Sequence, residues 1–461
     1  MDPFIGRERE LSLLRRAATS TSGDLIPIYG RRRVGKSALI IKLLSEHLGV
    51  YHLGQKAPAE LQRRAFLQNA AIAADEPLLA HIDASDWHTC LLTLTQRWPA
   101  GRPLLLAFDE FQWTVEASPE LPSVLQGLWD QHWRHQPTLI MLCGSFIGFM
   151  EREVLGQESP LFGRRTAQIH LQPFGHREAR AFHPNYSLAD AARTHFICGG
   201  VPQYLKTFDD QCSVEMNIRS QLLDEFAPLY REPEFLLREE LREVRNYHAI
   251  LMALARSSAS VSTLARATAL PERSLPYYLQ QLEGLGYVRR RQPLSPGAGR
   301  GRRVRYTLDD PLLKFWFRFV FPHQSALAQQ GPSALFDHAI KPHLPGHFGL
   351  CFERMCRLAL PALYAQEGVS TTFEIGEFWN AQVQIDVVSV RADDWVDLGE
   401  CKWGTVSSAP ALLAELQRKR KLYPNPHNAS VGLRAFTRNR PETDIKGLRW
   451  HTLEDVYGIV H

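Results

Sequence analysis

Short apolar runs alternate with helical stretches along the first third of the chain. The clearest apolar runs are Leu25–Tyr29, Leu104–Phe108, Leu139–Leu142 and Gln168–Leu171. Continuous apolar runs of this length are typical of strands that are buried on both faces of a sheet. Because helical stretches separate the runs, we expect the strands to be parallel. The pattern therefore predicts an α/β unit from Leu25 to about Leu171.

The middle of the chain is predicted to be helical, with one hairpin. No convincing strand pattern occurs from Pro173 to Arg245. Three helices and then two strands are expected after it, at Tyr247–Ala255, Val261–Ala267, Pro271–Leu285, Tyr287–Arg291 and Arg303–Leu308. The Gly-rich stretch Ser295–Gly301 is expected to be a flexible loop between the strands. Three helices and a hairpin describe a winged helix-turn-helix, in which Pro271–Leu285 would be the recognition helix.

The last third of the chain is predicted to form a second α/β unit. An aromatic, helical stretch, Pro311–Pro345, precedes it as a connector. From Gly346 onward a helix is followed by strands and by a basic helix near Leu412–Leu422. We therefore expect five parts with boundaries at residues 1–172, 173–245, 246–310, 311–345 and 346–461.

Composition narrows the class of protein. The 461 residues are 44% hydrophobic and 22% charged, which is typical of globular chains. The seven cysteines have no paired CxxC spacing, so a disulfide scaffold or a structural zinc is not expected. The start of the chain lacks a signal-peptide pattern, and no apolar run approaches the ~18 residues of a membrane helix. We expect a cytoplasmic protein.

A phosphate-binding loop follows the first predicted strand. Residues 30–37 fit G-x-x-x-x-G-K-[ST] and open a helical stretch that begins at Ala38, which is the context that the motif requires. Backbone N–H groups at a helix N-terminus favour an anion. Lys36 is expected to reach the β- and γ-phosphates of ATP, and Ser37 to ligate Mg²⁺. The alternative is a chance match. The candidate contacts are Gly30, Arg33, Val34, Gly35, Lys36, Ser37 and Ala38.

Polar residues follow two further predicted strands. Asp109 and Glu110 come directly after Leu104–Phe108. Asp109 would hold the Mg²⁺ shell and Glu110 would polarise the attacking water, although acidic residues also end strands for no catalytic reason. Ser145 follows the strand Leu139–Leu142 and would sense the γ-phosphate; a plain Gly-Ser turn is the alternative.

These motifs resemble, in type and order, archaeal-type ATPases of the signal-transducing (STAND) branch of the AAA+ superfamily. The other matching segments are Phe4–Leu11, Leu161–Arg165 and Gly199–Pro202. The resemblance implies an AAA+-type P-loop core with a helical lid, ATP and Mg²⁺ as cofactors, and a possible homo-oligomer. It further implies that Gly6, Arg7 and Pro202 lie near the adenine. Arg164 would lie near the γ-phosphate, in the same subunit or across an interface, with Arg165 as a substitute.

Positive charge gathers on the predicted hairpin. The net charge of the chain is only +4, yet seven arginines fall between positions 289 and 305. Such a cluster is typical of contact with DNA phosphates. The alternative is that these arginines meet an acidic protein surface. The seven are Arg289, Arg290, Arg291, Arg300, Arg302, Arg303 and Arg305.

Carboxylates and a lysine recur on two predicted strands near the end of the chain. Asp386 lies on one, and Glu400 and Lys402 share a face of the next. Two carboxylates can bind Mg²⁺, and a nearby ammonium can position a water against a phosphodiester. Glu353, on the preceding helix, is a third acid. The alternative for each residue is a solvated strand surface.

This order resembles the PD-(D/E)xK nuclease superfamily and the domain of uncharacterised function that is often fused to archaeal-type ATPases. The resemblance implies a restriction-endonuclease-like α/β fold, with Asp386 and Glu400 as metal ligands, Lys402 as the catalytic lysine and Glu353 as an auxiliary acid. The proline that often precedes the aspartate is missing here.

Some neighbouring residues are open to more than one role. Glu374 and Glu377 are further candidate ligands of the metal. Lys419, Arg420 and Lys421 follow the predicted site and could track a DNA backbone; a solvated helix face is the alternative.

The sequence therefore predicts an ATP-hydrolysing switch that is coupled to a DNA-binding, Mg²⁺-dependent nuclease. The alternative is an ATP-regulated DNA-binding or signalling protein in which the nuclease-like domain is inactive.

Overall fold

The computed structural model describes residues 4–82, 85–295, 304–440 and 445–459. Their contacts divide the chain into two compact units. The first runs up to Pro173 and includes Val201–Gln203, and the second comprises Phe174–Gly200 and the chain from Tyr204 onward. Arg300, Arg302, Arg303 and most of the loop that was expected to be flexible lie outside the described residues.

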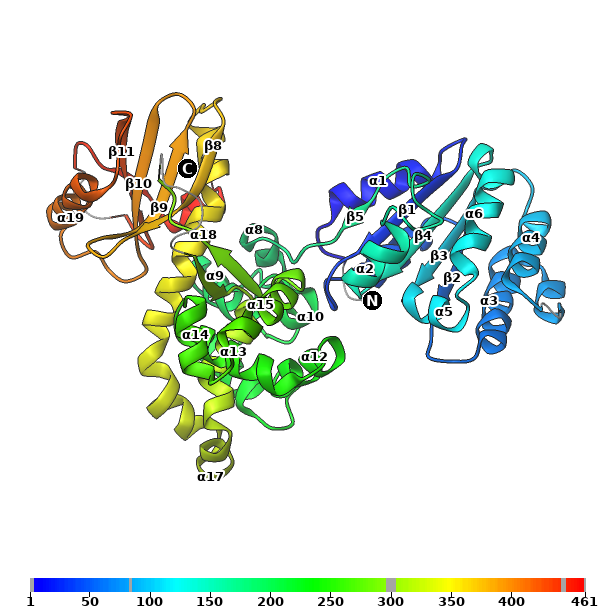
Figure 1. The fold of residues 1–461 in the computed structure, drawn as a ribbon, viewed down its shortest axis with the longest axis horizontal. Helices are drawn as coiled ribbons and strands as arrows, with labels where there is room; N and C mark the ends of the chain where they lie inside the picture. Colours follow the sequence, from blue (N-terminus) through cyan, green and yellow to red (C-terminus); the bar gives the residue numbers. More distant parts are fainter. Residues whose placement is uncertain (1–3, 83–84, 296–303, 441–444, 460–461) are drawn as a thin grey trace. The chain divides into compact units, whose positions relative to one another are not determined.

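The first unit is a parallel sheet between two layers of helices (Figure 1). Its strand order is β2-β3-β4-β1-β5. The strands are β1 (Asp24–Tyr29), β2 (Val50–Leu53), β3 (Leu104–Asp109), β4 (Thr138–Gly144) and β5 (Ile169–His170). The helices are α1 (Glu8–Ala18), α2 (Lys36–Leu44), α3 (Ala59–Ala74), α4 (Trp87–Arg97), α5 (Phe111–Ala117), α6 (Leu121–Gln131) and α7 (Ile147–Phe149). Shorter helical segments are Pro77–His81, Trp133–His135 and Met150–Val154.

Alternate residues of each central strand enter separate cores on the two faces of this sheet. Leu104, Leu106 and Phe108 of β3 join one core, which also receives side chains of α3, α4 and α6. Leu105 and Ala107 join the other core, with side chains of α1 and α2. Burial on both faces explains why these strands are continuous apolar runs. The P-loop, Asp109 and Ser145 all follow parallel strands, so they lie at the same edge of the sheet.

The second unit begins with helices, which occupy most of its first half. They are α8 (His176–Ala179), α9 (Leu188–Cys198), α10 (Pro202–Leu205, at the boundary of the units), α11 (Val214–Ile218), α12 (Glu232–Glu240), α13 (Val244–Arg256), α14 (Val261–Thr268), α15 (Leu275–Gly284), α16 (Pro311–Phe315), α17 (Gln324–Leu335) and α18 (Leu344–Gln366). Shorter segments are Arg180–Phe182, Arg219–Leu223, Glu272–Ser274, Trp316–Val320, Phe321–His323, Phe336–Ile340 and Lys341–His343. The antiparallel hairpin of β6 (Val288–Arg291) and β7 (Arg305–Leu308) follows α13–α15, in the predicted order.

A mixed sheet completes the second unit, in the order β12-β11-β10-β9-β8. Its elements are β8 (Phe373–Trp379), β9 (Gln384–Arg391), β10 (Trp395–Lys402), α19 (Ala409–Leu422), β11 (Ser430–Thr437), β12 (Arg449–His451) and α20 (Leu453–Tyr457). β8, β9 and β10 are antiparallel neighbours, whereas β10, β11 and β12 are parallel. This sheet and α18 position the carboxylates that the sequence singled out.

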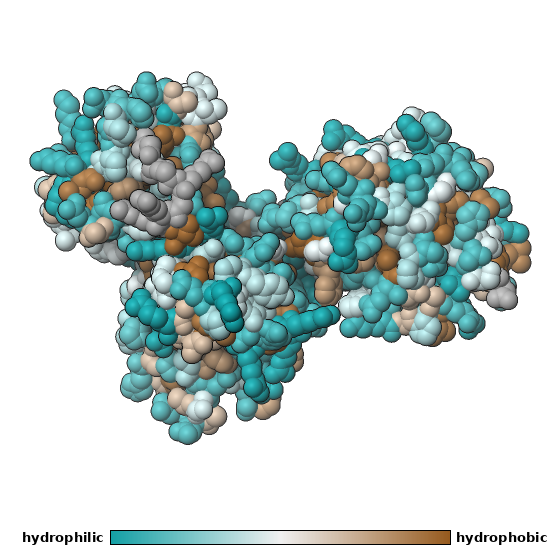
Figure 2. All heavy atoms as spheres, in the orientation of Figure 1, coloured by the Kyte–Doolittle hydropathy of each residue, from teal (hydrophilic) through white to brown (hydrophobic). Residues whose placement is uncertain are grey.

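The face of the chain drawn in Figure 2 is mainly hydrophilic, with apolar side chains in small scattered groups. In the part of the chain that the structure describes, no helix has the length and apolar character needed to cross a bilayer.

Candidate nucleotide site and carboxylate cluster

The loop between β1 and α2 has the backbone conformation of a tight phosphate cradle. Gly30 has φ 147°, and a Cβ atom there would lie 2.3 Å from the carbonyl oxygen of Leu171. Gly35 has φ 93° and Arg33 has φ 67°, both in the left-handed region. Glycine adopts such angles without steric cost. The two glycines of the motif therefore occupy positions where a side chain is disfavoured, at Gly30 by the close approach of Leu171 and at Gly35 by the backbone angle.

Lys36 lies inside the loop. Its side chain is only 6% exposed, and Nζ donates hydrogen bonds to the carbonyl oxygens of Gly30 and Arg31, both at 2.9 Å. Burial lowers the pKa of Lys36, while the nearby carboxylates of Glu110 and Asp109 act in the opposite direction. The ammonium therefore lies within the loop and close to both acids.

Tyr51 interacts with both Asp109 and Ser37, and no sequence motif predicts this residue. Its hydroxyl donates to Oδ2 of Asp109 at 2.6 Å, and it also interacts with the Ser37 side chain. Burial, followed by the hydrogen bond to Asp109, raises the pKa of Tyr51. Tyr51 comes from β2, an edge strand with a weak apolar pattern, so only the parallel pairing of β2 with β3 brings it here. The Asp109 carboxylate and the Ser37 hydroxyl, two groups that can ligate a metal ion, therefore both interact with the Tyr51 hydroxyl.

Glu110 is held by two donors from neighbouring elements. Ser145 Oγ donates to Oε2 of Glu110 at 2.8 Å, and Gln112 Nε2 donates to the same oxygen. Glu110 has φ 48°, an uncommon angle for a residue with a side chain. The structure therefore brings together Ser145 and Glu110, which follow different strands.

Arg7 connects the P-loop to the segment that follows β5. Its guanidinium is 7% exposed and donates to the carbonyl oxygens of Val34 at 3.1 Å and Gln172 at 2.6 Å. Gly6 and Arg7 both have left-handed backbone angles at the start of α1. Pro202 lies on the loop as well, because a Cβ atom on Gly35 would be 3.8 Å from its Cγ. The segments expected near the adenine therefore do lie beside the P-loop.

Arg164 is not brought to the P-loop within this chain. Its guanidinium pairs with Asp130 at 2.7 Å, near the end of α6. The next residues run beside the start of β1, where the Thr166 N–H donates to Leu25 O at 3.0 Å. The P-loop follows the other end of β1, so Arg164 lies at the opposite edge of the sheet. Arg165 is the nearer arginine, since its charge reaches Tyr29 at the end of β1.

Asp386 and Glu400 are neighbours in the second unit, as expected. Val387 of β9 pairs with Gly399 of β10, and Asp386 Oδ2 accepts a hydrogen bond from the Cys401 N–H at 3.1 Å. Asp386 is 7% exposed and Glu400 is 5% exposed. Burial, with the nearby charges of Glu353 and Glu400, raises the pKa of Asp386 to about 7. Burial also raises the pKa of Glu353. Three acids therefore share a poorly solvated site.

Two lysines neutralise Glu400. Lys402 Nζ lies 3.0 Å from Oε1, and Lys419 Nζ lies 2.5 Å from Oε2. The hypothesis that Lys419 tracks a DNA backbone is wrong for this residue, because it is 7% exposed and turned toward Glu400, whereas Arg420 and Lys421 are exposed. In the described ranges, no three His, Cys, Asp or Glu side chains are grouped so that they could hold a metal ion together.

The hairpin arginines mostly face the protein itself. Arg291 pairs with Glu377 of β8, and Arg289 lies 3.3 Å from Asp309. Arg305 lies over the Trp379 ring, at 5.3 Å from its centroid, while Arg290 is exposed. Arg289 and Arg291 therefore meet acids of the protein itself, which fits the alternative of an acidic protein surface, although the Arg289 side chain remains 42% exposed. Glu377 is likewise taken by Arg291, with Arg357 at 3.7 Å, so it is not a free metal ligand.

Comparison with known protein families finds one match in each half of the chain. Residues 4–208 match the family described as "ATPase domain predominantly from Archaea", and residues 316–412 match "Archaea bacterial proteins of unknown function". Residues 4–208 are therefore similar to archaeal ATPase domains. The second match contains Glu353, Asp386, Glu400 and Lys402.

Relatives of known sequence or structure are distant. The chain is 25% identical over 424 residues to Uncharacterized protein MJECL04 of Methanocaldococcus jannaschii, which covers 91% of this chain and 92% of the relative. It is 49% identical over 41 residues, 9% of this chain and 70% of the relative, to Uncharacterized ATP-binding protein MJ0423 of the same organism. The Walker-type ATPase PABY2304 of Pyrococcus abyssi superposes with a TM-score of 0.48 and 18% identity, over 68% of this chain and 96% of that one.

Proposed function

Because residues 4–208 match a family of archaeal ATPase domains, we propose that this protein is a switch driven by ATP binding and hydrolysis. The observation that carries the proposal is the convergence of Lys36, Ser37, Asp109, Glu110 and Ser145 at one edge of the first sheet.

Each residue has a role that follows from its position. The P-loop N–H groups and Lys36 bind the phosphates, and Lys36 exchanges its carbonyl partners for phosphate oxygens. Glu110, oriented by Ser145 and Gln112, accepts the proton of the attacking water. Ser145 exchanges Glu110 for the γ-phosphate, and so reports whether that phosphate is present.

The donor set near Tyr51 fits magnesium. Asp109 and Ser37 supply a carboxylate and a hydroxyl oxygen, the ligand types that Mg²⁺ takes beside substrate phosphates. When bound, Mg²⁺ would neutralise charge on the β- and γ-phosphates. Tyr51, which donates to Asp109, orients that carboxylate.

Binding and hydrolysis can be separated by two variants. Lys36→Ala should weaken ATP binding by about 100-fold, because it removes a buried charged donor. Glu110→Gln should keep ATP binding but slow phosphate release by roughly 10²–10⁴-fold. Lys42→Ala, at an exposed position on the same helix, is the matched control and should change neither. Unchanged ATP affinity in Lys36→Ala, measured by calorimetry, would refute the site.

For the second unit we propose metal-dependent phosphodiester hydrolysis of DNA. Burial, followed by the charges of Glu353 and Glu400, raises the pKa of Asp386 to about 7, so a divalent cation would stabilise the ionised cluster. Asp386 and Glu400 would hold Mg²⁺, Lys402 would position the water, and Glu353 would assist. The helices α13–α15 with the hairpin would act as a winged helix, with α15 and exposed Arg290 toward DNA.

The competing function is that of an ATP-regulated DNA-binding or signalling protein with an inactive nuclease-like domain. The observation that favours it is Lys419, which occupies Oε2 of Glu400, a position that a metal ion would need.

Plasmid nicking with Mg²⁺ or Mn²⁺, with and without ATP, separates the two functions. The nuclease function predicts nicking by the parent and none by Asp386→Asn or Lys402→Ala, with ATP hydrolysis intact in both. Lys421→Ala, an exposed lysine on α19, is the matched control and should nick normally. If the parent binds DNA but never nicks it, or if the two site variants nick like the parent, the nuclease assignment fails.

A further inference from the structure

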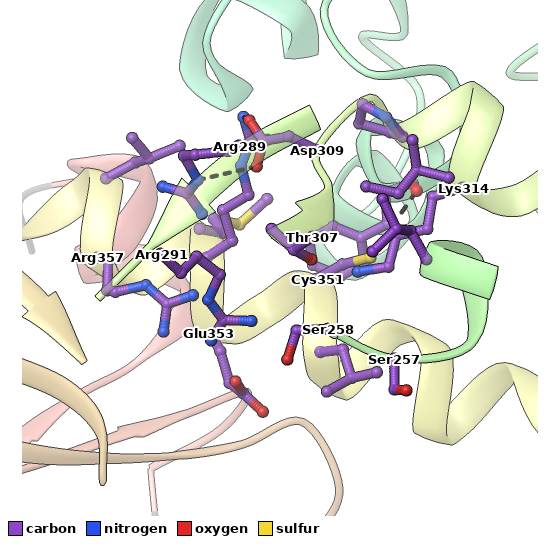
Figure 3. Close-up of a pocket in the computed structure, with 18 of the residues that line it drawn as sticks. Ser257, Ser258, Arg289, Arg291, Thr307, Asp309, Lys314, Cys351, Glu353 and Arg357 are labelled. Atoms are coloured by element: carbon purple, nitrogen blue, oxygen red, sulfur yellow. Dashed lines mark hydrogen bonds and ion pairs between the residues drawn. The ribbon is translucent and has the colours of Figure 1, made fainter. Parts of the chain in front are cut away.

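An arginine-lined cavity lies in the second unit, and its lining includes no residue of the P-loop motif. Its volume is about 300 Å³, at the lower end of the range for small-molecule sites. The hairpin β6–β7, α13, α18 and β8–β9 contribute to its wall (Figure 3). Seven lining side chains are cationic, and two, Asp309 and Glu353, are acidic. The seven are Arg256, Arg289, Arg291, Arg305, Lys314, Arg354 and Arg357.

Several of these positive charges lack a counter-charge. Asp309 forms ion pairs with both Arg289, at 3.3 Å, and Arg354, at 2.7 Å. Glu377, which does not line the cavity, forms ion pairs with Arg291 and Arg357. Arg256, Arg305 and Lys314 have no carboxylate within ion-pair distance in the described part of the chain. The cationic side chains that line the cavity therefore outnumber the acidic side chains that could neutralise them.

The cationic groups also repel one another and are poorly solvated. Burial lowers the pKa of Arg291 to about 10, and the nearby guanidinium groups of Arg357 and Arg289 act in the same direction. The Nε atom of Arg354 is buried and has no hydrogen-bond partner in the described residues, while Arg289 Nε has only the 3.3 Å contact with Asp309, which lacks hydrogen-bond geometry. An anion in the cavity would satisfy these donors and relieve the repulsion.

Apolar side chains occupy the rest of the wall. Phe196, Leu254, Met355 and Leu358 line it, as does Trp379, whose ring lies near Arg291 and Arg305. A ligand that fills the cavity must therefore present both an anionic group and an apolar surface.

We infer that this cavity is a second ligand site, which binds a phosphate-bearing group of about mononucleotide size. A nucleotide meets both requirements, since its phosphates pair with arginines and its base has an apolar face. The phosphate can come from a free nucleotide or from the end of a nucleic-acid strand.

Occupancy of this site would also reach the carboxylate cluster. Glu353 lines the cavity, and its charge acts on Asp386. A phosphate that draws Arg291 or Arg357 toward itself would remove positive charge from Glu353. This regulatory consequence rests on the proposed metal site, whereas ligand binding itself does not.

Calorimetry on the full chain that carries Lys36→Ala tests the inference, because this substitution should weaken binding at the P-loop by about 100-fold. The probes are ADP, inorganic pyrophosphate and a 5′-phosphorylated single-stranded oligonucleotide, with its unphosphorylated form as reference. We expect saturable binding of at least one phosphate probe. Adding Arg305→Gln with Lys314→Gln should weaken that binding at least 10-fold. Arg266→Gln, at an exposed position on α14, should change it less than 2-fold.

The arms of the experiment distinguish the sources. Binding of ADP and pyrophosphate identifies a free nucleotide, whereas binding of the phosphorylated oligonucleotide alone identifies a strand end. If no probe binds the Lys36→Ala protein, or if the double variant binds as tightly as that background, the inference is wrong. A melting curve checks folding of the double variant. If that variant is unfolded, Arg256→Gln replaces it, with the same 10-fold loss expected.

Discussion

Replacement of Asp386 by asparagine should stabilise the protein above neutral pH. The carboxyl group is 7% exposed and accepts a hydrogen bond from the Cys401 N–H at 3.1 Å. Asparagine has nearly the same volume and keeps an acceptor oxygen for this bond. It lacks the negative charge, which faces Glu353 and Glu400. The variant therefore removes one charge from the cluster and leaves the packing unchanged.

The sign and size of the effect follow from the pKa. The pKa of Asp386 rises from 3.8 to about 7 in the folded protein, through burial and then the charges of Glu353 and Glu400. The native state therefore binds the proton more tightly than the unfolded state. Proton binding by Asp386 therefore contributes to the free energy of unfolding. This contribution is complete below about pH 4 and is lost as the pH rises through 7. A difference of about 3 units corresponds to about 4 kcal/mol, and sharing among three acids lowers the net effect to about 2–4 kcal/mol.

Thermal melting at pH 5, 6, 7 and 8, with chelator present, measures this effect. The midpoint of Asp386→Asn should exceed that of the parent by about 4–8 °C at pH 8 and by little at pH 5. Excess Mg²⁺ should raise the parent midpoint at pH 8 and leave the variant unchanged. Asp393→Asn, in the turn between β9 and β10, is the control, because Arg391 lowers the pKa of this exposed acid, and it should give no gain at pH 8. An advantage of Asp386→Asn that is equal at pH 5 and pH 8 would refute the reasoning.

Three further predictions concern single contacts. Tyr51→Phe removes the 2.6 Å bond to Asp109, so ATP hydrolysis should need about 10-fold more Mg²⁺, as a magnesium titration of phosphate release would show. Glu377→Gln leaves the largely buried Arg291 beside a neutral group, which should destabilise the second unit by about 3 kcal/mol in denaturant unfolding. Arg164→Ala should change ATP affinity, measured by calorimetry, less than about 2-fold. It should lower the free energy of unfolding by less than about 1 kcal/mol, because the partner of Arg164 is a partly exposed acid.

The hydrophobic pattern predicted the strands that are buried along their whole length, and it did not predict β2, which is buried only at alternate residues. β1, β3 and β4 are buried on both faces, so each is a continuous apolar run. β2, in contrast, is a four-residue strand at the edge of the sheet, and Tyr51 and Leu53 are partly or fully exposed. Its pattern is too short and too mixed to identify, and with it Tyr51 was missed.

Site residues were predictable where the chemistry is local in sequence. Gly30, Gly35 and Lys36 form one loop, whose turns the motif encodes directly. Whether the hairpin arginines have acidic partners depends on tertiary packing, since Arg291 pairs with Glu377, which lies 86 positions away. Arg164 likewise depends on Asp130, which lies 34 positions away. A charge count along the sequence cannot reveal such compensation.

The most direct test of the proposed switch is phosphate release from ATP with Mg²⁺, measured at saturating ATP for the parent and for Glu110→Gln. We expect steady release by the parent and a loss of roughly 10²–10⁴-fold in the variant, with ATP affinity unchanged. Release at the parental rate by Glu110→Gln, or no release by the parent at any Mg²⁺ concentration, would contradict this expectation.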